Sequence, residues 1–129
     1  MKLNAKEIES VSNLEPFKRY QYLIKKVADL EEVWTLVDKN GDIALSDIDD
    51  HTLISFWTAE AFIKSNLEEG WKDCIPFKLS LDNLEDSLIP LIIENEYLIN
   101  VFPVNGKAGF VVDINEFIRD LNDELEQYQ

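Results

Sequence analysis

Three oxygen-bearing side chains occur at alternate positions in the segment LVDKNGDIALSDID, namely Asp38, Asn40 and Asp42. This is the spacing of the first three ligands in an EF-hand calcium loop. Such a loop also needs glycine at its sixth position and a bidentate glutamate at its twelfth, where this chain has Ile43 and Asp49. The preceding VWTLV alternates like a strand, whereas an EF-hand loop follows a helix. The sequence therefore predicts a β-hairpin turn here, closed by Gly41.

The same segment leads into the sole histidine, His51, past further carboxylates at Asp47, Asp49 and Asp50. A weak metal-assisted hydrolase or a small-ligand site using the Asp38 to His51 loop is therefore an alternative. Metal hydrolase sites usually take several ligands from separate elements, and this chain offers one histidine. We predict no metal site, no cofactor and no catalytic residue.

The single cysteine, Cys74, is a second candidate for chemistry, as a nucleophile paired with His51. It lies between Asp73 and Ile75, without a helix N-terminus that would lower its pKa. A buried or incidental thiol is the alternative. Nucleotide binding has no support, because the four glycines of the chain do not form a phosphate-binding loop.

Length and composition describe one folded domain spanning residues 1–129, with 46% hydrophobic residues and a net charge of −14. Apolar runs are too short to span a bilayer, so we expect no membrane crossing. A lone cysteine and an N-terminus without an apolar signal segment point to a reducing, cytoplasmic setting. So acidic a chain repels phosphate backbones, which disfavours direct nucleic-acid binding.

Periodicity predicts an α+β fold, a mostly antiparallel sheet built from two β-hairpins plus additional strands and packed against about four helices. Strand-like runs occupy residues 33–37, 42–46, 51–57, 75–80, 97–103 and 108–112. Helices are expected at 4–11, from Pro16 through 30, from Thr58 to a stop at Gly70, after Ser80 with a kink or end at Pro90, and after Asp113. Hairpins are expected at 33–46 and at 97–112, the second turning at 104–107.

The last predicted helix has a strongly acidic outer face, which is the candidate partner surface: Glu116, Asp120, Asp123, Glu124 and Glu126. A solvated face is the ordinary explanation of such a pattern. Small acidic proteins that neutralise basic nucleases or nucleic-acid-binding proteins use such a surface for fast, electrostatically steered association. The net charge of −14 favours that hypothesis.

A candidate aromatic patch consists of Trp57 and Trp71. Tryptophans at clear apolar positions usually belong to the core. Trp57 is the best exception, because it would face away from Ile54 and Phe56 unless both faces of the sheet are covered.

Several motifs in order, VWTLVDKNG, SFW, EGW, IPL and LINVFP, resemble the bacterial family called domain of unknown function 2750. The resemblance covers about residues 17–121. That family has W-L-P in its middle helix where this chain has Leu88, Ile89 and Pro90. The resemblance implies a small, stand-alone bacterial α+β domain with no assigned activity, and it supplies no catalytic residues.

We therefore expect a non-enzymatic protein-binding module, of the immunity, inhibitor or adaptor type, that binds a basic protein through its acidic surface. The alternative from a different class is the small-ligand or hydrolase site in the Asp38 to His51 loop. A third hypothesis is that the acidic face mimics DNA, in which case duplex DNA would compete for the partner. The sequence does not indicate an oligomeric state.

Overall fold

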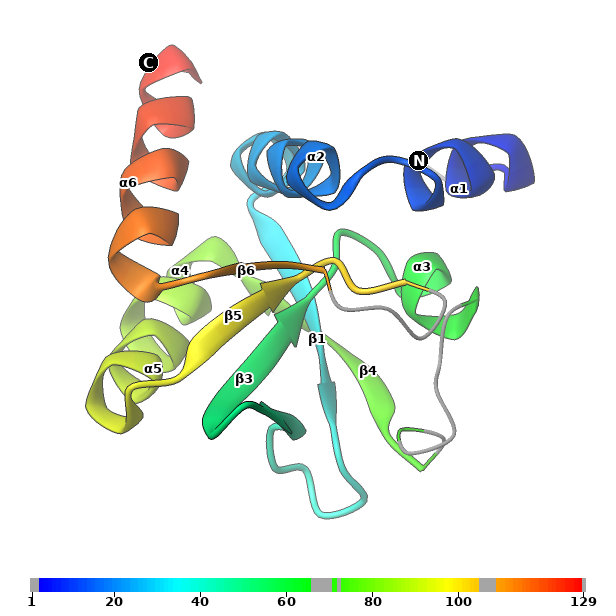
Figure 1. Ribbon diagram of the computed structural model, residues 1–129. Helices are drawn as coiled ribbons and strands as arrows, with labels where there is room; N and C mark the ends of the chain where they lie inside the picture. Colours follow the sequence, from blue (N-terminus) through cyan, green and yellow to red (C-terminus); the bar gives the residue numbers. More distant parts are fainter. Residues whose placement is uncertain (1–2, 66–70, 72, 105–108, 129) are drawn as a thin grey trace.

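The computed structural model describes residues 3–65, 71, 73–104 and 109–128 and forms one α+β domain (Figure 1). In Figure 1, α1 and α2 lie above the strands, α4, α5 and α6 lie to their left, and α3 lies to their right. The elements, in chain order, are α1 Ala5–Ser12, α2 Pro16–Leu30, β1 Glu32–Val37, β2 Leu45–Ile48, β3 His51–Phe56, α3 Glu60–Ser65, β4 Ile75–Ser80, α4 Leu81–Asn83, the π-helix Leu84–Leu88, α5 Ile89–Asn95, β5 Leu98–Val101, β6 Phe110–Val112, α6 Ile114–Leu125 and a final 3₁₀ turn Glu126–Tyr128. Within the described ranges, no helix has the length and apolar character needed to cross a bilayer.

The strands form an antiparallel β1–β4 pair and a four-stranded sheet of order β2-β3-β5-β6. Antiparallel pairing dominates, as predicted, but β3 and β5 run parallel. Their connection passes through α3, β4 and α5, the kind of long crossover that parallel pairing requires. The two sheets meet at Trp34 and Trp57, where each backbone N–H donates to the other residue's carbonyl at 2.9 and 2.8 Å.

The first predicted hairpin forms only at its turn. Gly41, at φ 84°, donates its N–H to the Asp38 carbonyl, and the Asp38 N–H donates to the Asp42 carbonyl. Beyond an isolated bridge from Val37 to Ile43, β1 pairs with β4 instead, and β2 pairs with β3. The hairpin therefore lies one strand later, where Asp49 and Asp50 both have positive φ angles, as a type I′ turn requires. The second hairpin is confirmed in its β5–β6 pairing. Of its predicted turn at 104–107, residues 105–107 lie outside the described residues.

Two helix starts follow the predicted caps: the side chains of Ser80 and Asp113 accept hydrogen bonds from the backbone N–H three residues further on. Asn4, which was expected inside the first helix, caps it in the same way. Thr58, the predicted start of the next helix, does not cap it, because α3 begins two residues later at Glu60.

The predicted disturbance at Pro90 takes the form of a π-helical turn, in which the Ile89 N–H donates to the Leu84 carbonyl. Pro90 then occupies the first turn of α5, directly after this π-helical turn. The predicted helix stop at Gly70 lies outside the described residues.

A buried junction joins the sheets to α2, and it centres on Trp57 and Phe102. The Phe102 N–H donates to the Phe56 carbonyl at 2.8 Å, and the Trp57 Nε1–H donates to the Pro103 carbonyl at 2.9 Å. Phe102 itself has a φ of 60°, a conformation that a phenylalanine rarely adopts, so the surrounding contacts must hold it there. We call this set of contacts the Trp57–Phe102 junction.

Arg19 on α2 completes the Trp57–Phe102 junction. Its Nε donates to the Phe102 carbonyl at 3.0 Å, and its Nη1 donates to the carbonyl of Leu14, in the segment between α1 and α2. The side chain is 5% exposed, and burial lowers the pKa of Arg19 from its ordinary value. One guanidinium therefore links α2, the α1–α2 connection and the end of β5.

The closest backbone approach near this junction involves Gly109. A Cβ at this position would lie 1.9 Å from the Val101 carbonyl oxygen, so Gly109→Ala should force the β5–β6 hairpin apart and cost about 2–3 kcal/mol of unfolding free energy. Gly41→Asn is the control, because its surroundings are open and asparagine tolerates a positive φ. Urea unfolding measures both variants. Equal, small losses would contradict the close packing described here.

Candidate functional site

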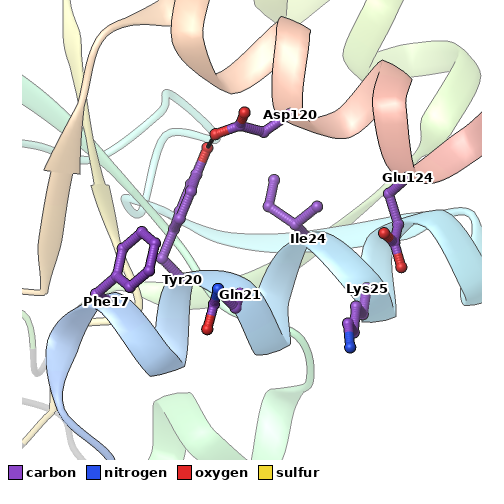
Figure 2. A pocket seen from close by; sticks show the side chains of 7 residues that line it. All are labelled: Phe17, Tyr20, Gln21, Ile24, Lys25, Asp120 and Glu124. Carbon is purple, nitrogen blue, oxygen red and sulfur yellow. Dashed lines mark hydrogen bonds between the residues drawn. The ribbon is translucent and has the colours of Figure 1, made fainter.

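A groove of about 310 Å³ lies between α2 and α6 (Figure 2). One wall comes from α2 and carries Phe17, Tyr20 and Ile24, with Gln21 and Lys25 towards solvent; the other wall comes from α6 and carries Asp120 and Glu124. The groove thus combines an apolar lining with two carboxylates. We call it the α2–α6 groove.

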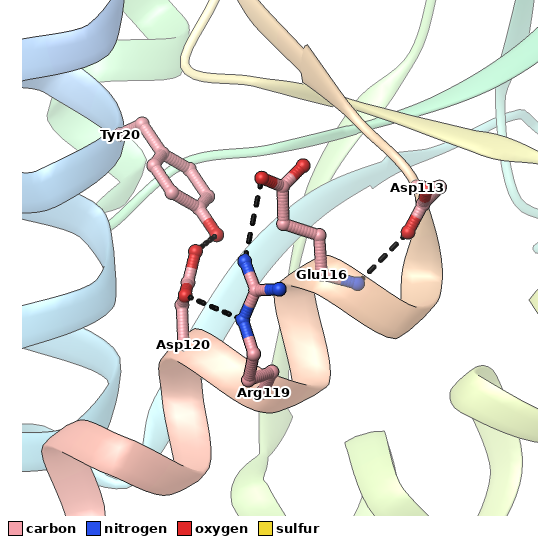
Figure 3. Close-up of polar contacts among 5 residues, drawn as sticks. All are labelled: Tyr20, Asp113, Glu116, Arg119 and Asp120. Atoms are coloured by element: carbon pink, nitrogen blue, oxygen red, sulfur yellow. Dashed lines mark hydrogen bonds and ion pairs between the residues drawn. The ribbon is translucent and has the colours of Figure 1, made fainter.

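Both walls follow from helical spacing. Tyr20 and Ile24 are four residues apart on α2, as are Asp120 and Glu124 on α6, so each pair lies on one helix face. Phe117 and Leu121 bury the adjacent stripe of α6 in the core. At the start of α6, the Asp113 side chain accepts from the Glu116 N–H at 2.8 Å and thereby fixes where the helix begins (Figure 3). The core thus determines which acidic residues turn towards α2.

A short hydrogen bond closes one end of the groove. The Tyr20 hydroxyl donates to Asp120 Oδ2 at 2.6 Å, across 100 residues of sequence (Figures 2 and 3). Burial raises the pKa of Tyr20 above its ordinary value, and the hydrogen bond to Asp120 and its charge raise it further. The hydroxyl therefore remains protonated at neutral pH, and it holds the Asp120 carboxylate in place.

Arg119 neutralises part of the acidic face. Its Nη2 lies 3.4 Å from Glu116 Oε1, and its Nε lies 3.4 Å from Asp120 Oδ1 (Figure 3). These contacts are long and exposed, so solvent screens them and they add little stability. Of the five acidic residues proposed to bind a partner protein, Glu116 and Asp120 thus already contact a basic side chain of the same helix.

The structure divides the five predicted partner-surface residues between two settings. Asp120 and Glu124 line the groove, and Glu116 lies one turn before Asp120 on the same helix. Asp123 and Glu126 are exposed at the C-terminal end of α6, away from the groove lining. The α2 wall, with Phe17, Tyr20 and Ile24, was not predicted as part of a site, because the sequence predicted only a helix from Pro16 through 30. A tyrosine hydroxyl within that helix was the available signal, since a buried hydroxyl needs a polar partner.

The tryptophan pair does not form an exposed patch. Trp57 is 1% exposed, donates to the Pro103 carbonyl and packs edge-to-face against Trp71, with ring centroids 5.8 Å apart. Trp71 is partly buried against the core. Trp57 is buried because both faces of the sheet are covered at the end of its strand. This is the condition named above for a core position of Trp57.

The Asp38 to His51 segment contains a hydrogen-bonded turn, strand β2 and the Asp49–Asp50 turn. In the first turn, Asp38 Oδ1 accepts from the backbone N–H of Asn40 at 2.8 Å and of Asp42 at 3.0 Å, so the backbone occupies one oxygen of this carboxylate. His51 is exposed at the start of β3, opposite Ile48. Within the part of the chain that the structure describes, no group of three or more His, Cys, Asp or Glu side chains could hold a metal ion. The α2–α6 groove does not include residues of this loop.

Cys74 is partly buried next to the same turn. Burial raises the pKa of its thiol, and the negative charges of Asp38 and Asp73 raise it further. The reactive thiolate is therefore disfavoured at neutral pH.

Residues 20–121 match the model of one protein family, described as "Protein of unknown function (DUF2750)". The chain belongs to this family. The match includes most of the α2 wall and all of β1 to β6, and it reaches Asp120 on the other wall. No curated protein matches the chain. The family therefore confirms the resemblance seen in the sequence, and it assigns no activity.

Removing the Tyr20 hydroxyl tests how the groove is held. Tyr20→Phe leaves Asp120 Oδ2 without its donor and should cost about 1–2 kcal/mol of unfolding free energy at pH 7. Since the pKa of Tyr20 is raised in the folded state, the folded state holds this proton more tightly than the unfolded state. The protonated hydroxyl therefore contributes its full share of the free energy of unfolding below the unfolded tyrosine pKa of about 10, and this share is lost as the pH rises above it. Urea unfolding from pH 8 to 11 should show a shallower high-pH decline in Tyr20→Phe. Parallel declines would contradict the hydrogen bond.

Proposed function

We propose that the protein binds a basic partner protein through the α2–α6 groove and the acidic end of α6, as a non-enzymatic immunity, inhibitor or adaptor module. The observation that supports this is the pairing of apolar and acidic walls in one groove. A reducing setting such as the bacterial cytoplasm fits the single, partly buried Cys74.

The lining of the groove suits a lysine or arginine side chain. The aliphatic stem of such a residue packs on apolar surface while its charged head reaches a carboxylate. Phe17, which is 49% exposed, and Ile24 provide the apolar surface, and Glu124 lies across the groove from them (Figure 2). An arginine would also stack on the Phe17 ring.

The charge of the whole chain favours fast association with a basic partner. A net charge of −14 gives a long-range field that raises the encounter rate, most strongly at low ionic strength. A stable interface buries about 800 Å² on each partner, more than this groove offers. The exposed Asp123 and Glu126 at the end of α6 extend the surface beyond it.

Affinity capture from the native bacterium tests this proposal, with the tagged wild type compared at low and high salt. We expect one or more basic proteins to be retained at low salt and released at high salt. The double variant Asp123→Lys/Glu124→Lys should weaken binding of the captured partner by about tenfold or more.

The matched control is Glu85→Lys/Asp86→Lys, which makes the same charge change on two exposed neighbours in the π-helix. It should lose only the part of the affinity that depends on net charge. Equal losses in both double variants would show that the end of α6 is not the contact surface. Absence of a retained partner at low salt would overturn the proposal itself.

A further inference from the structure

The turn between β1 and β2 contains an asparagine followed directly by a glycine, Asn40 and Gly41. Both residues are exposed, and a Cβ at Gly41 would meet no atom within 4 Å. Asparagine is among the chemically labile residues, and a glycine after it leaves the backbone nitrogen unshielded, because glycine has no side chain. Sequence and exposure therefore place a reactive pair at this turn, outside the α2–α6 groove.

The reaction open to this pair is an intramolecular acyl transfer, which proximity favours. The Gly41 nitrogen loses its proton and attacks Asn40 Cγ, and the new C–N bond replaces the bond from Cγ to Nδ2. The side-chain nitrogen takes up a proton and leaves as ammonia, so the product is a cyclic succinimide. Water then opens the ring: addition at Cγ gives aspartate, and addition at the backbone carbonyl carbon of Asn40 gives isoaspartate. Water is the only co-reactant, and no atom is oxidised or reduced.

The closed turn keeps the attacking nitrogen away from this carbon. The Gly41 N–H donates to the Asp38 carbonyl at 3.0 Å, so the proton that must leave is held in a hydrogen bond. Neither Lys39 nor Asn40 has a positive φ, and Gly41 has a φ of 84°, which is the pattern of a type I turn with a left-handed residue after it. Attack requires a large rotation about the Asn40 Cα–C bond, which would carry the Gly41 N–H away from Asp38. The reaction therefore waits for the turn to open.

The Asp38 side chain stabilises the closed turn. Its Oδ1 accepts from the Asn40 N–H at 2.8 Å and from the Asp42 N–H at 3.0 Å, so it holds the backbone on both sides of the reactive pair. Hydrogen bonds to a carboxylate are stronger than those between neutral groups. The negative charge of Asp38 also opposes deprotonation of the nearby Gly41 nitrogen. Asp38 therefore slows the reaction in two ways, through the shape of the turn and through its charge.

We propose that Asn40 is a site of spontaneous deamidation, and that Asp38 sets its rate by holding the turn closed. Each conversion adds one carboxylate to a chain whose net charge is −14. The isoaspartate product also inserts a methylene group into the backbone, inside the ring that the Gly41 hydrogen bond closes. That longer ring cannot keep the geometry of the native turn. The modification thus leaves a covalent record of turn opening, and it does not depend on the proposed partner surface.

Peptide mapping by mass spectrometry tests this site in the full chain, incubated folded and in urea at the same mildly alkaline pH. We expect deamidation of Asn40 in both, with a rate about tenfold or more higher in urea, where the hydrogen bonds of the turn are absent. Asn122 is the internal reference, because it is exposed but is followed by Asp123. Asn105, also followed by a glycine, lies outside the described residues and is measured in a separate peptide. A rate at Asn40 no higher than at Asn122 in urea, or equal rates at Asn40 with and without urea, would overturn the proposal.

Two variants and one control test the role of Asp38. Asp38→Ala removes both side-chain hydrogen bonds and should raise the folded-state rate at Asn40 about fivefold. Asp38→Asn keeps an oxygen that can accept the same bonds but lacks the charge, so its rate should fall between those of the wild type and Asp38→Ala. Asp42→Ala removes a neighbouring carboxylate and keeps the Asp38 contacts, which use the Asp42 backbone, so its rate should rise far less. A wild-type rate in Asp38→Ala, or an equal rise in Asp42→Ala, would contradict the proposal.

Discussion

Buried hydrogen bonds at the Trp57–Phe102 junction connect the two sheets to α2. Trp57 pairs through its backbone with Trp34 of β1, and Phe102 pairs with Phe56 at the end of β3. Arg19 then binds the Phe102 carbonyl from α2. A buried arginine is costly unless its donors are satisfied, and here backbone carbonyls satisfy two of them. The position of α2 is therefore set by this junction as well as by its apolar face.

The position of α2 in turn determines what α6 presents. With Arg19 held at the junction, Tyr20 lies next to it on α2 and reaches Asp120 on α6. This hydrogen bond places the two helices so that a groove with apolar and acidic walls remains between them (Figure 2). The acidic residues of α6 are thus held by the fold, which lowers the entropy that a partner must overcome to use them.

Local signals in the sequence predicted much of this fold, because caps and turns depend on neighbouring residues. Ser80 and Asp113 each start a helix, and Gly41 closes its turn, for reasons visible within a few residues. The pairing of β1 with β4 and of β3 with β5 was not predicted, since partners for a strand are chosen by the whole core. The groove was half predicted: the acidic wall follows from one helix, but the Tyr20–Asp120 contact joins residues 100 positions apart.

Hydrogen exchange, measured by mass spectrometry with and without the captured basic partner, tests the central claim most directly. If the α2–α6 groove is the partner surface, exchange should slow in peptides from α2 and α6 and stay unchanged in β2 and β4. Protection of β2 or β4, with exchange in α2 and α6 unaffected, would contradict the account and place the binding surface elsewhere on the molecule.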